Sequence, residues 1–425
     1  MKKQFIFDSY KFDSNSKQLD LLYQSGEITF IESYKFDFDF QPDYNLQALD
    51  RALQSLFFMA GVSYYKAFLA EEIVIKAGLL DSEGASFFSK TYERGLGEFF
   101  YTNSLDPKTS VQFFANSHKL EPDVIPESNG LLVGIGGGKD SLVSIEILRD
   151  HAKTATWSVG HRSQLEPLVA KIGLPHFWVE RKIDQQLIQL NSEGALNGHV
   201  PISAILSCVG VIVAILTGYQ DVVVSNESSA NEPTLTYQGV EINHQYSKSL
   251  KYEKGFQGYL KHSFGDSIRY YSFLRPLSEV HIAEIFARIG FTKYKEVFSS
   301  CNRAFTQDQN SMFWCGECAK CAFIFLALTP FIPRGELESL FHGKNLLRHA
   351  QLETTYKSLL GIDGDKPLDC VGEIKESREA MRLATKNYPE LGQKYQFEIP
   401  ADYSYKTLAN HSMPNEIHDI LIKAL

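Results

Sequence analysis

The chain has no apolar run long enough to cross a membrane. Its longest apolar stretch, residues 202–216, is interrupted by serines and a glycine and is short for a bilayer span, so we expect a buried helix there. Near the start, Asp8 and Asp13 occur before any apolar run becomes long enough for a signal peptide. We therefore expect a cytoplasmic protein with no membrane partner.

An excess of positive charge is also missing. The sequence has 42 lysine and arginine residues against 51 aspartate and glutamate residues, a formal net charge of −9. Because affinity for nucleic acid comes largely from Lys and Arg on phosphates, this balance counts against a nucleic-acid partner. With 44% hydrophobic residues the composition shows no sign of disorder, and 425 residues suffice for two or three domains with buried cores.

Cysteine is scarce, with 6 residues in the chain, yet its distribution is informative. Cys315, Cys318 and Cys321 are each separated by two residues, and Cys301 lies upstream. Four thiolates can complete a tetrahedral site, so we predict structural Zn²⁺ here, with an iron–sulfur cluster as the alternative. In a reducing cytoplasm, disulfides are not expected.

A glycine-rich loop lies between a predicted strand at 131–135 and a predicted helix at 141–148. Glycine lets the backbone curl tightly around an anion, and the helix that follows directs its free N–H groups and positive dipole end at that anion. The loop therefore predicts a phosphate-binding site. Its residues are Gly136, Gly137, Gly138, Lys139, Asp140 and Ser141.

The spacing of this loop excludes two common nucleotide motifs. A Walker A loop needs four residues before its Gly-Lys-[Ser/Thr], but Gly134 and Gly138 enclose fewer, and Asp140 replaces the hydroxyl residue. A G-x-G-x-x-G fingerprint fails because Lys139 occupies the third glycine position. The loop instead resembles the S-G-G-x-D-S loop of PP-loop ATP pyrophosphatases, with Gly136 in place of the leading serine. That resemblance implies ATP and pyrophosphate binding by 136–141, with Lys139 as charge partner.

From about residue 128 the pattern alternates between strands and helices, which predicts a parallel sheet covered on both faces. We expect an α/β fold: a parallel-sheet PP-loop core at 126–330, an α+β N-terminal domain at 1–125 and a helical C-terminal region at 331–425. Within the N-terminal part, the periodicity predicts helices over 46–70 and 82–99, the second capped by Ser82.

Two polar segments of the expected core are candidates for ligand contact. Ser225, Asn226 and Glu227 follow a predicted strand at 221–224, where parallel sheets bind their ligands. We interpret them as contacts to substrate, with Glu227 and Asp140 near Mg²⁺; a solvated turn is the alternative. Arg275 is a candidate partner for a phosphate or a carboxylate.

An isolated cysteine in the C-terminal region is the remaining candidate. Cys370 lies in a polar, glycine-containing segment, three residues before Glu373. The simpler interpretation is a small buried hydrophobic residue. The functional hypothesis is a thiol and carboxylate pair formed by Cys370 with Glu373 or Asp369.

Several blocks, in order along the chain, together resemble the ATP-dependent UDP-N-acetylmuramoyl-L-alanyl-L-glutamate epimerases of bacterial peptidoglycan precursor synthesis. The blocks are residues 49–66, 136–141, 225–227, 314–323 and 366–373. The resemblance implies inversion of the terminal L-glutamate of the UDP-muramoyl dipeptide, using ATP and Mg²⁺ and yielding AMP and pyrophosphate. Cys370 and Glu373 are then the candidates for proton transfer.

Two other functions stay open. The chain could be a PP-loop enzyme that adenylates a tRNA base or another substrate for sulfur or nitrogen transfer, although the acidic balance counts against tRNA. The cysteine pattern is also similar to that of 7-cyano-7-deazaguanine synthase, a PP-loop enzyme with a C-terminal Cys₄ zinc site; this similarity supports the zinc prediction and is not a further functional hypothesis. A non-catalytic ATP-binding regulator is the third hypothesis.

Overall fold

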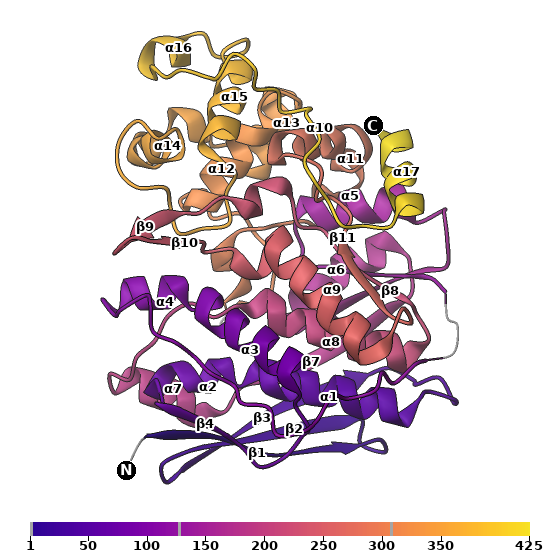
Figure 1. The fold of residues 1–425 in the computed structure, drawn as a ribbon. Coiled ribbons are helices and arrows are strands. Elements are labelled where there is room, and N and C mark those ends of the chain that lie inside the picture. Colours follow the sequence, from indigo (N-terminus) through magenta and orange to yellow (C-terminus); the bar gives the residue numbers. More distant parts are fainter. Residues whose placement is uncertain (1–2, 126–128, 307–308) are drawn as a thin grey trace.

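One large sheet crosses the protein (Figure 1). The computed structural model describes residues 3–125, 129–306 and 309–425, so residue 126, where the predicted core begins, lies outside the described residues. Nine strands form the sheet, in the order β11-β8-β5-β6-β7-β3-β2-β1-β4, and β9 pairs with β10 separately. The strands are β1 (Gln4–Asp13), β2 (Gln18–Ser25), β3 (Ile28–Asp37), β4 (Glu72–Ile75), β5 (Leu131–Gly134), β6 (Thr154–Val159), β7 (His176–Lys182), β8 (Asp221–Val224), β9 (Leu235–Tyr237), β10 (Val240–Ile242) and β11 (Arg269–Ser272).

The sheet combines a parallel part with an antiparallel part. Strands β11, β8, β5, β6 and β7 are parallel, whereas β7 pairs antiparallel with β3, in a register that places Phe36 opposite Val179. β3, β2 and β1 then continue as an antiparallel meander, and β4 pairs in parallel with β1. The expected α/β class with a parallel sheet is confirmed, and the PP-loop assignment stays a prediction.

Helices cover the sheet on both faces in its parallel part. They are α1 (Leu46–Ala60), α2 (Val62–Phe68), α3 (Ser82–Gly95), α4 (Gly97–Thr102), α5 (Lys139–Leu148), α6 (Arg162–Ile172), α7 (Gln185–Ser192), α8 (Ile202–Thr217), α9 (Leu250–Phe264), α10 (Glu279–Ile289), α11 (Phe291–Tyr294), α12 (Ala319–Leu328), α13 (Arg334–Leu340), α14 (Glu353–Leu359), α15 (Ile374–Ala384), α16 (Glu390–Lys394) and α17 (Asn415–Ala424). Residues 331–425 thus contain helices and no strand.

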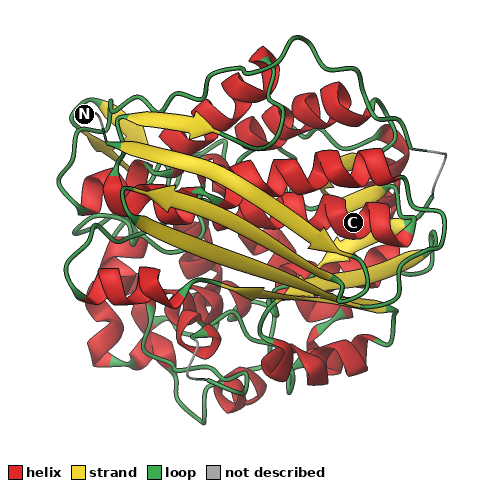
Figure 2. Cartoon of the chain, turned by 90° about the horizontal axis from the view of Figure 1, so that it is seen from below, coloured by secondary structure: helices red, strands yellow, loops and turns green. Residues whose placement is uncertain are grey.

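Two hydrophobic cores lie on opposite faces of the sheet. Leu132 of β5 belongs to the core that contains residues of α1, α8 and α9, whereas Leu131 and Val133 belong to the core with α5, α10 and α12. This division follows from the strand geometry, which points successive side chains to opposite faces. In the described part of the chain, helices cover only one face of the antiparallel strands: Ile31 of β3 is 47% exposed, and Figure 2 shows these strands in front of the helices.

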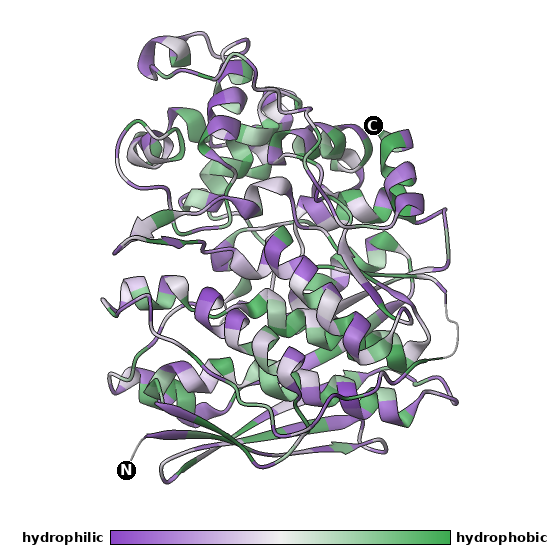
Figure 3. Cartoon of the chain, viewed as in Figure 1, coloured by the Kyte–Doolittle hydropathy of each residue, from purple (hydrophilic) through white to green (hydrophobic). Residues whose placement is uncertain are grey.

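The predicted buried helix at 202–216 is confirmed as α8, whose residues are predominantly hydrophobic (Figure 3). No described helix combines the length and the apolar character that a bilayer span requires. The strand predicted at 221–224 is confirmed as β8.

The helix predicted over 46–70 is wrong in one respect, because it is divided at Gly61 into α1 and α2. A Cβ atom on Gly61 would lie 2.5 Å from the ring of Phe7, so the close approach of β1 requires glycine here. The helix expected over 82–99 is likewise divided, at Leu96. Its N-cap is Asp81 instead of Ser82: the Asp81 carboxylate accepts a hydrogen bond from the Gly84 N–H at 3.1 Å.

Candidate functional site at the carboxyl ends of β5 and β8

The glycine loop lies at the carboxyl end of β5, where the chain changes direction across the sheet. β5 pairs with β6 on one side and β8 on the other, and the chain passes through β6 and β7 before it returns to β8. Ligands of parallel α/β sheets bind at such a switch point. The Ser144 and Ser225 hydroxyls are 2.7 Å apart, so the loop after β8 is hydrogen-bonded to the helix that follows the glycine loop.

The start of α5 is arranged for an anion. The helix begins at Lys139, two residues before the predicted start, and its N-cap residue Gly138 has no side chain to satisfy the first N–H groups. Such groups, with the helix dipole, favour a negatively charged ligand. The Ser141 hydroxyl donates to the Gly138 carbonyl at 3.2 Å, which holds the turn together.

The two glycines before it have different surroundings. Gly137 has φ +89°, and a Cβ atom there would lie 2.7 Å from Phe305. The Gly137 carbonyl accepts a hydrogen bond from the Ser299 N–H at 3.0 Å. Gly136 has nothing within 4 Å of an added Cβ, so the serine side chain that it lacks would be accommodated.

Lys139 is buried beside two carboxylates. Its side chain is 1% exposed and ion-paired with Asp140 and with Glu279, the first residue of α10. Burial opposes the charge of Lys139, but these carboxylates outweigh it and raise its pKa. Glu279 also faces Lys320 at 3.8 Å, and although burial opposes its ionisation, the two lysines lower its pKa. The predicted charge partner of an anion is therefore present as a cation, engaged with protein carboxylates.

Glu227 adds a third carboxyl group to this cluster. It is 6% exposed, and the Ser229 hydroxyl is 3.4 Å from its carboxylate. Burial, followed by the charges of Glu279 and Asp140, raises its pKa. The charges of Glu279 and Asp140 thus reach Glu227, and Mg²⁺ near Glu227 and Asp140 stays a prediction.

Arg275 is fully buried and holds the loop after β8 in place. Its guanidinium binds the Glu253 carboxylate at 2.9 and 3.1 Å, the Glu227 carbonyl at 2.7 Å and the Lys248 carbonyl. Nearby, the Asn226 carbonyl accepts a hydrogen bond from a serine hydroxyl of β11. With its donors engaged in this way, Arg275 positions the site, and its direct contact with substrate stays a prediction.

Cys370 lies within a group of side chains that the sequence did not indicate. Its Sγ accepts a hydrogen bond from Lys248 Nζ at 3.2 Å and is 3.8 Å from His244 Nε2. On the other side of the ring, His244 Nδ1 is hydrogen-bonded to Glu98, and Lys320 donates to the Cys370 carbonyl. No local motif connects these residues: Lys248 and Cys370 are 122 positions apart in the chain.

The charges around Cys370 favour its thiolate. Burial opposes ionisation, but Lys248, the His244 hydrogen bond and Lys320 together lower its pKa to about 6. Burial likewise opposes the charge of His244, yet its bonds to Cys370 and Glu98 raise its pKa to about 9. Between these values, a thiolate and imidazolium pair is the favoured state.

Glu373 is the N-cap residue of α15 and has structural partners. Its carboxylate caps the helix and is 2.7 Å from Lys375 Nζ. Glu376 accepts hydrogen bonds from the N–H groups of Glu373 and Glu279 at 2.7 and 3.0 Å. It thereby ties the C-terminal region to α10 beside Lys139. A proton-transfer role for Glu373 stays a prediction.

The cysteine cluster is closed and lies next to the glycine loop. The Cys301 and Cys318 sulfurs are 4.0 Å apart, those of Cys315 and Cys321 are 3.7 Å apart, and all four lie within 4.8 Å of one another. Metal–sulfur bonds of about 2.3 Å in a tetrahedron place sulfurs about 3.8 Å apart. The donor set thus fits a single metal ion better than an iron–sulfur cluster, whose several iron atoms would keep the sulfurs farther apart.

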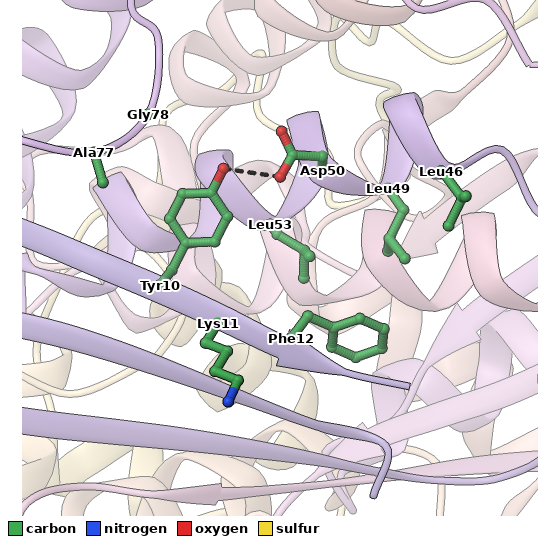
Figure 4. Close-up of a pocket in the computed structure, with 9 residues that line it drawn as sticks. All are labelled: Tyr10, Lys11, Phe12, Leu46, Leu49, Asp50, Leu53, Ala77 and Gly78. Carbon is green, nitrogen blue, oxygen red and sulfur yellow. Dashed lines mark hydrogen bonds between the residues drawn. The ribbon is translucent and has the colours of Figure 1, made fainter. Parts of the chain in front are cut away.

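A pocket of about 560 Å³ lies elsewhere, between β1, α1 and the turn after β4 (Figure 4). Tyr10 and Asp50, whose side chains are hydrogen-bonded at 2.8 Å, line it together with Phe12 and Leu53. No residue of the glycine loop or of the Cys370 group lines this pocket. It is therefore separate from the site described above.

These features define an α/β protein with a polar site at the switch point of a largely parallel sheet. Two family models match the chain: the MurL N-terminal domain over residues 1–273 and the MurL C-terminal domain over residues 297–397. The first includes every strand of the sheet; the second includes the cysteine cluster and Cys370. No solved structure matches the chain.

Curated relatives extend this match. A protein of Salinispora tropica named UDP-N-acetyl-alpha-D-muramoyl-L-alanyl-L-glutamate epimerase is 40% identical over 388 residues, which cover 89% of this chain and 84% of that protein. A protein of the same name from Xanthomonas oryzae pv. oryzae is 41% identical over 345 residues, covering 80% and 75% respectively. The chain belongs to the MurL family, and the family resemblance of its motifs is confirmed.

Proposed function

We propose that this chain inverts the terminal L-glutamate of UDP-N-acetylmuramoyl-L-alanyl-L-glutamate during peptidoglycan precursor synthesis. The observation that carries the proposal is the match, over most of the chain, to relatives named for this epimerase activity. The ATP dependence is supported by the glycine loop, whose position at the start of α5 suits a phosphate group.

Adenylation explains how the α-proton becomes removable. Deprotonation beside a free carboxylate would place a second negative charge next to the first, which is very unfavourable. Attack of that carboxylate on the α-phosphate of ATP breaks the bond to pyrophosphate and forms an acyl adenylate. Its carbonyl carries no charge and accepts the electron pair released from the α-carbon. Hydrolysis after proton return yields AMP and the D-glutamyl product.

The described residues divide the work of the first step. The N–H groups of 136–141 and the Lys139 ammonium would hold the departing pyrophosphate, with Ser225 and Asn226 beside the substrate. Asp140 and Glu227 are the proposed residues near Mg²⁺, which would offset the charge of the triphosphate. Arg275 keeps Glu227 in position through its carbonyl. Cys370 and Glu373 are the proposed proton-transfer groups.

The cysteine cluster is proposed to bind structural Zn²⁺. A site closed by four thiolates leaves no open coordination position for a substrate, which is typical of zinc that stabilises a fold. Because Ser299 bonds to the Gly137 carbonyl only two residues before Cys301, the metal would also fix the glycine loop.

The test measures pyrophosphate release from ATP and Mg²⁺, with and without UDP-N-acetylmuramoyl-L-alanyl-L-glutamate, alongside chiral analysis of the glutamate. We expect pyrophosphate release that depends on the dipeptide substrate, together with D-glutamate. A matched substrate ending in L-alanine serves as the control. D-glutamate formed without ATP would contradict the adenylation step, and absence of both signals would contradict the proposed function.

A further inference from the structure

The group around Cys370 contains more than the thiol itself. Its other members come from three elements that are distant from Cys370 in the sequence: the short helix Tyr246–Lys248, the loop after β10 with His244, and α4 with Glu98. We call Cys370, Lys248, His244 and Glu98 the thiol relay. Of these, only Cys370 was indicated by the sequence.

We propose that Cys370, within the thiol relay, is the base that removes the glutamyl α-proton. Lys248 and His244 are positioning residues for its sulfur, and Glu98 fixes the His244 ring. This inference rests on the proposed epimerisation. In the step, the Cα–H bond breaks, an S–H bond forms, and the electron pair moves into the acyl carbonyl as an enolate. The proton passes to Cys370 and no other reactant is consumed.

The geometry supports a thiolate at this position. Lys248 Nζ approaches the sulfur at 3.2 Å and His244 Nε2 at 3.8 Å, so two nitrogen donors face one sulfur. Because the Glu98 carboxylate accepts a hydrogen bond from His244 Nδ1–H, His244 can direct its other N–H at Cys370. Cys370, His244 and Lys248 each keep some solvent exposure, and the approach of the substrate to them is part of the proposal.

Other charged groups surround the relay and were considered with it. Lys320 of α12 favours the thiolate, and His199 is 3.6 Å from Glu98, where burial and His244 lower its pKa to about 4. Asp369 precedes Cys370, and burial raises its pKa. The cations in contact with the Cys370 sulfur or its carbonyl are Lys248, His244 and Lys320.

The position of Glu98 explains why a carboxylate is needed there. Its carboxylate, 13% exposed, joins two histidines whose rings are 4.6 Å apart. A neutral residue here would let His244 change tautomer and lose its donor toward Cys370. The relay therefore predicts that Glu98 matters for the chemistry although it lies on the far side of the ring from the sulfur.

The first experiment measures the thiolate directly, without epimerase activity. Iodoacetamide labelling of Cys370 is followed by mass spectrometry from pH 5 to pH 10 in the wild type and in Lys248→Met and His244→Gln. We expect a midpoint near pH 6 in the wild type and a shift upward by at least one unit in each variant, toward the unperturbed value of about 8.5. Lys375→Met, which removes a charge that does not contact Cys370, should keep the wild-type midpoint. Unchanged midpoints in both relay variants would overturn the proposal.

The second experiment follows the α-proton. In D₂O, the wild type should incorporate deuterium at the glutamyl α-carbon, whereas Cys370→Ala should lose this incorporation and keep substrate-dependent pyrophosphate release. Glu98→Gln should reduce incorporation with its pH profile displaced upward, as a purely structural residue would not. Deuterium incorporation by Cys370→Ala at the wild-type rate would overturn the base assignment.

The two measurements separate this inference from the proposed function. If the wild type releases no pyrophosphate with the dipeptide substrate, the proposed function fails and the base role falls with it, whatever the labelling shows. If pyrophosphate release is intact but labelling and deuterium exchange are unchanged in the variants, only the relay fails. A second metal ion per chain that is lost in His199→Ala would also overturn the relay, because Glu98 and His244 would then be metal ligands.

Discussion

Gly136 and Gly137 are adjacent in the loop, but only one of them requires glycine. Gly137 has φ +89° and lies against Phe305, whereas an added Cβ on Gly136 meets nothing. Gly137→Ala should therefore lose about 1–2 kcal/mol of stability from its left-handed backbone alone and should impair pyrophosphate release. Gly136→Ser, which restores the hydroxyl typical of PP-loops, should keep both. Urea unfolding and pyrophosphate assays check this, and equal losses in the two variants would contradict it.

The raised pKa of Glu376 predicts how the stability of the chain depends on pH. Glu376 is 1% exposed, and burial, followed by the charge of Glu373, raises its pKa from 4.5 to about 8. The folded chain therefore holds a proton that the unfolded chain releases above about pH 4.5, so this residue makes stability fall as pH rises from about 4.5 to 8. The full slope is about 1.4 kcal/mol per pH unit.

The matched variant is Glu376→Gln, which removes the titration and keeps one acceptor for the Glu373 and Glu279 N–H groups. Urea unfolding at pH 5 and pH 8 should show a smaller loss of stability on raising the pH than in the wild type. A pH dependence identical to that of the wild type would show that Glu376 is ionised in the folded chain.

Local sequence patterns predicted individual elements well where the structure of the element depends on residues close to it in the chain. The strand at 221–224 and the helix at 202–216 follow from apolar runs alone. The requirement for glycine at position 61, where the helix is divided, could not be predicted, because it comes from the ring of Phe7 on β1, more than fifty residues earlier. Helical periodicity continues through such a break, so sequence alone favours one long helix.

The segment around α12 carries the prediction for the metal. Cys318 is the N-cap of α12 and accepts a hydrogen bond from the Cys321 N–H at 3.4 Å. Cys321→Ser should lose the metal and increase hydrogen exchange in residues 297–306 and 309–328, because the proposed ion would fix both the helix start and the loop beside it. Metal analysis and exchange mass spectrometry measure both. Cys208→Ala, in the core of α8, is the control and should retain one zinc ion per chain; retention of zinc by Cys321→Ser would contradict the Cys₄ assignment.

Across the whole molecule, the sequence predicted several segments of the candidate site, but not every side chain that the fold brings to them. The loops at 136–141 and 225–227 converge as expected, because the carboxyl ends of parallel strands share one edge of a sheet. The thiol relay could not be foreseen, because Lys248, His244 and Glu98 belong to no motif and meet Cys370 only through the packing of distant elements. The joining of β1–β3 and the parallel strands into one sheet could not be predicted either, because the β3–β7 pairing is a long-range contact.

That pairing leads to a prediction for the whole chain. Arg181 of β7 is ion-paired with the fully buried Glu32 of β3 at 2.7 Å, and Tyr34 also bonds to this carboxylate. Arg181→Met would leave the Glu32 charge buried without its cation, at an expected cost of about 3–5 kcal/mol. Arg162→Met provides the control, because the Arg162–Asp37 pair joins the same region but is exposed, and its loss should cost at most about 1 kcal/mol.

The measurement distinguishes one cooperative unit from two. All three tryptophans lie between residues 157 and 314, so their fluorescence reports on the parallel sheet and the cysteine segment, whereas far-ultraviolet circular dichroism reports on the entire chain. Because the sheet is continuous through β3 and β7, both signals should shift together to lower urea concentration in Arg181→Met. A fluorescence transition that stays in place while circular dichroism shows an earlier phase would mean that the antiparallel meander unfolds independently of the sheet that carries the site.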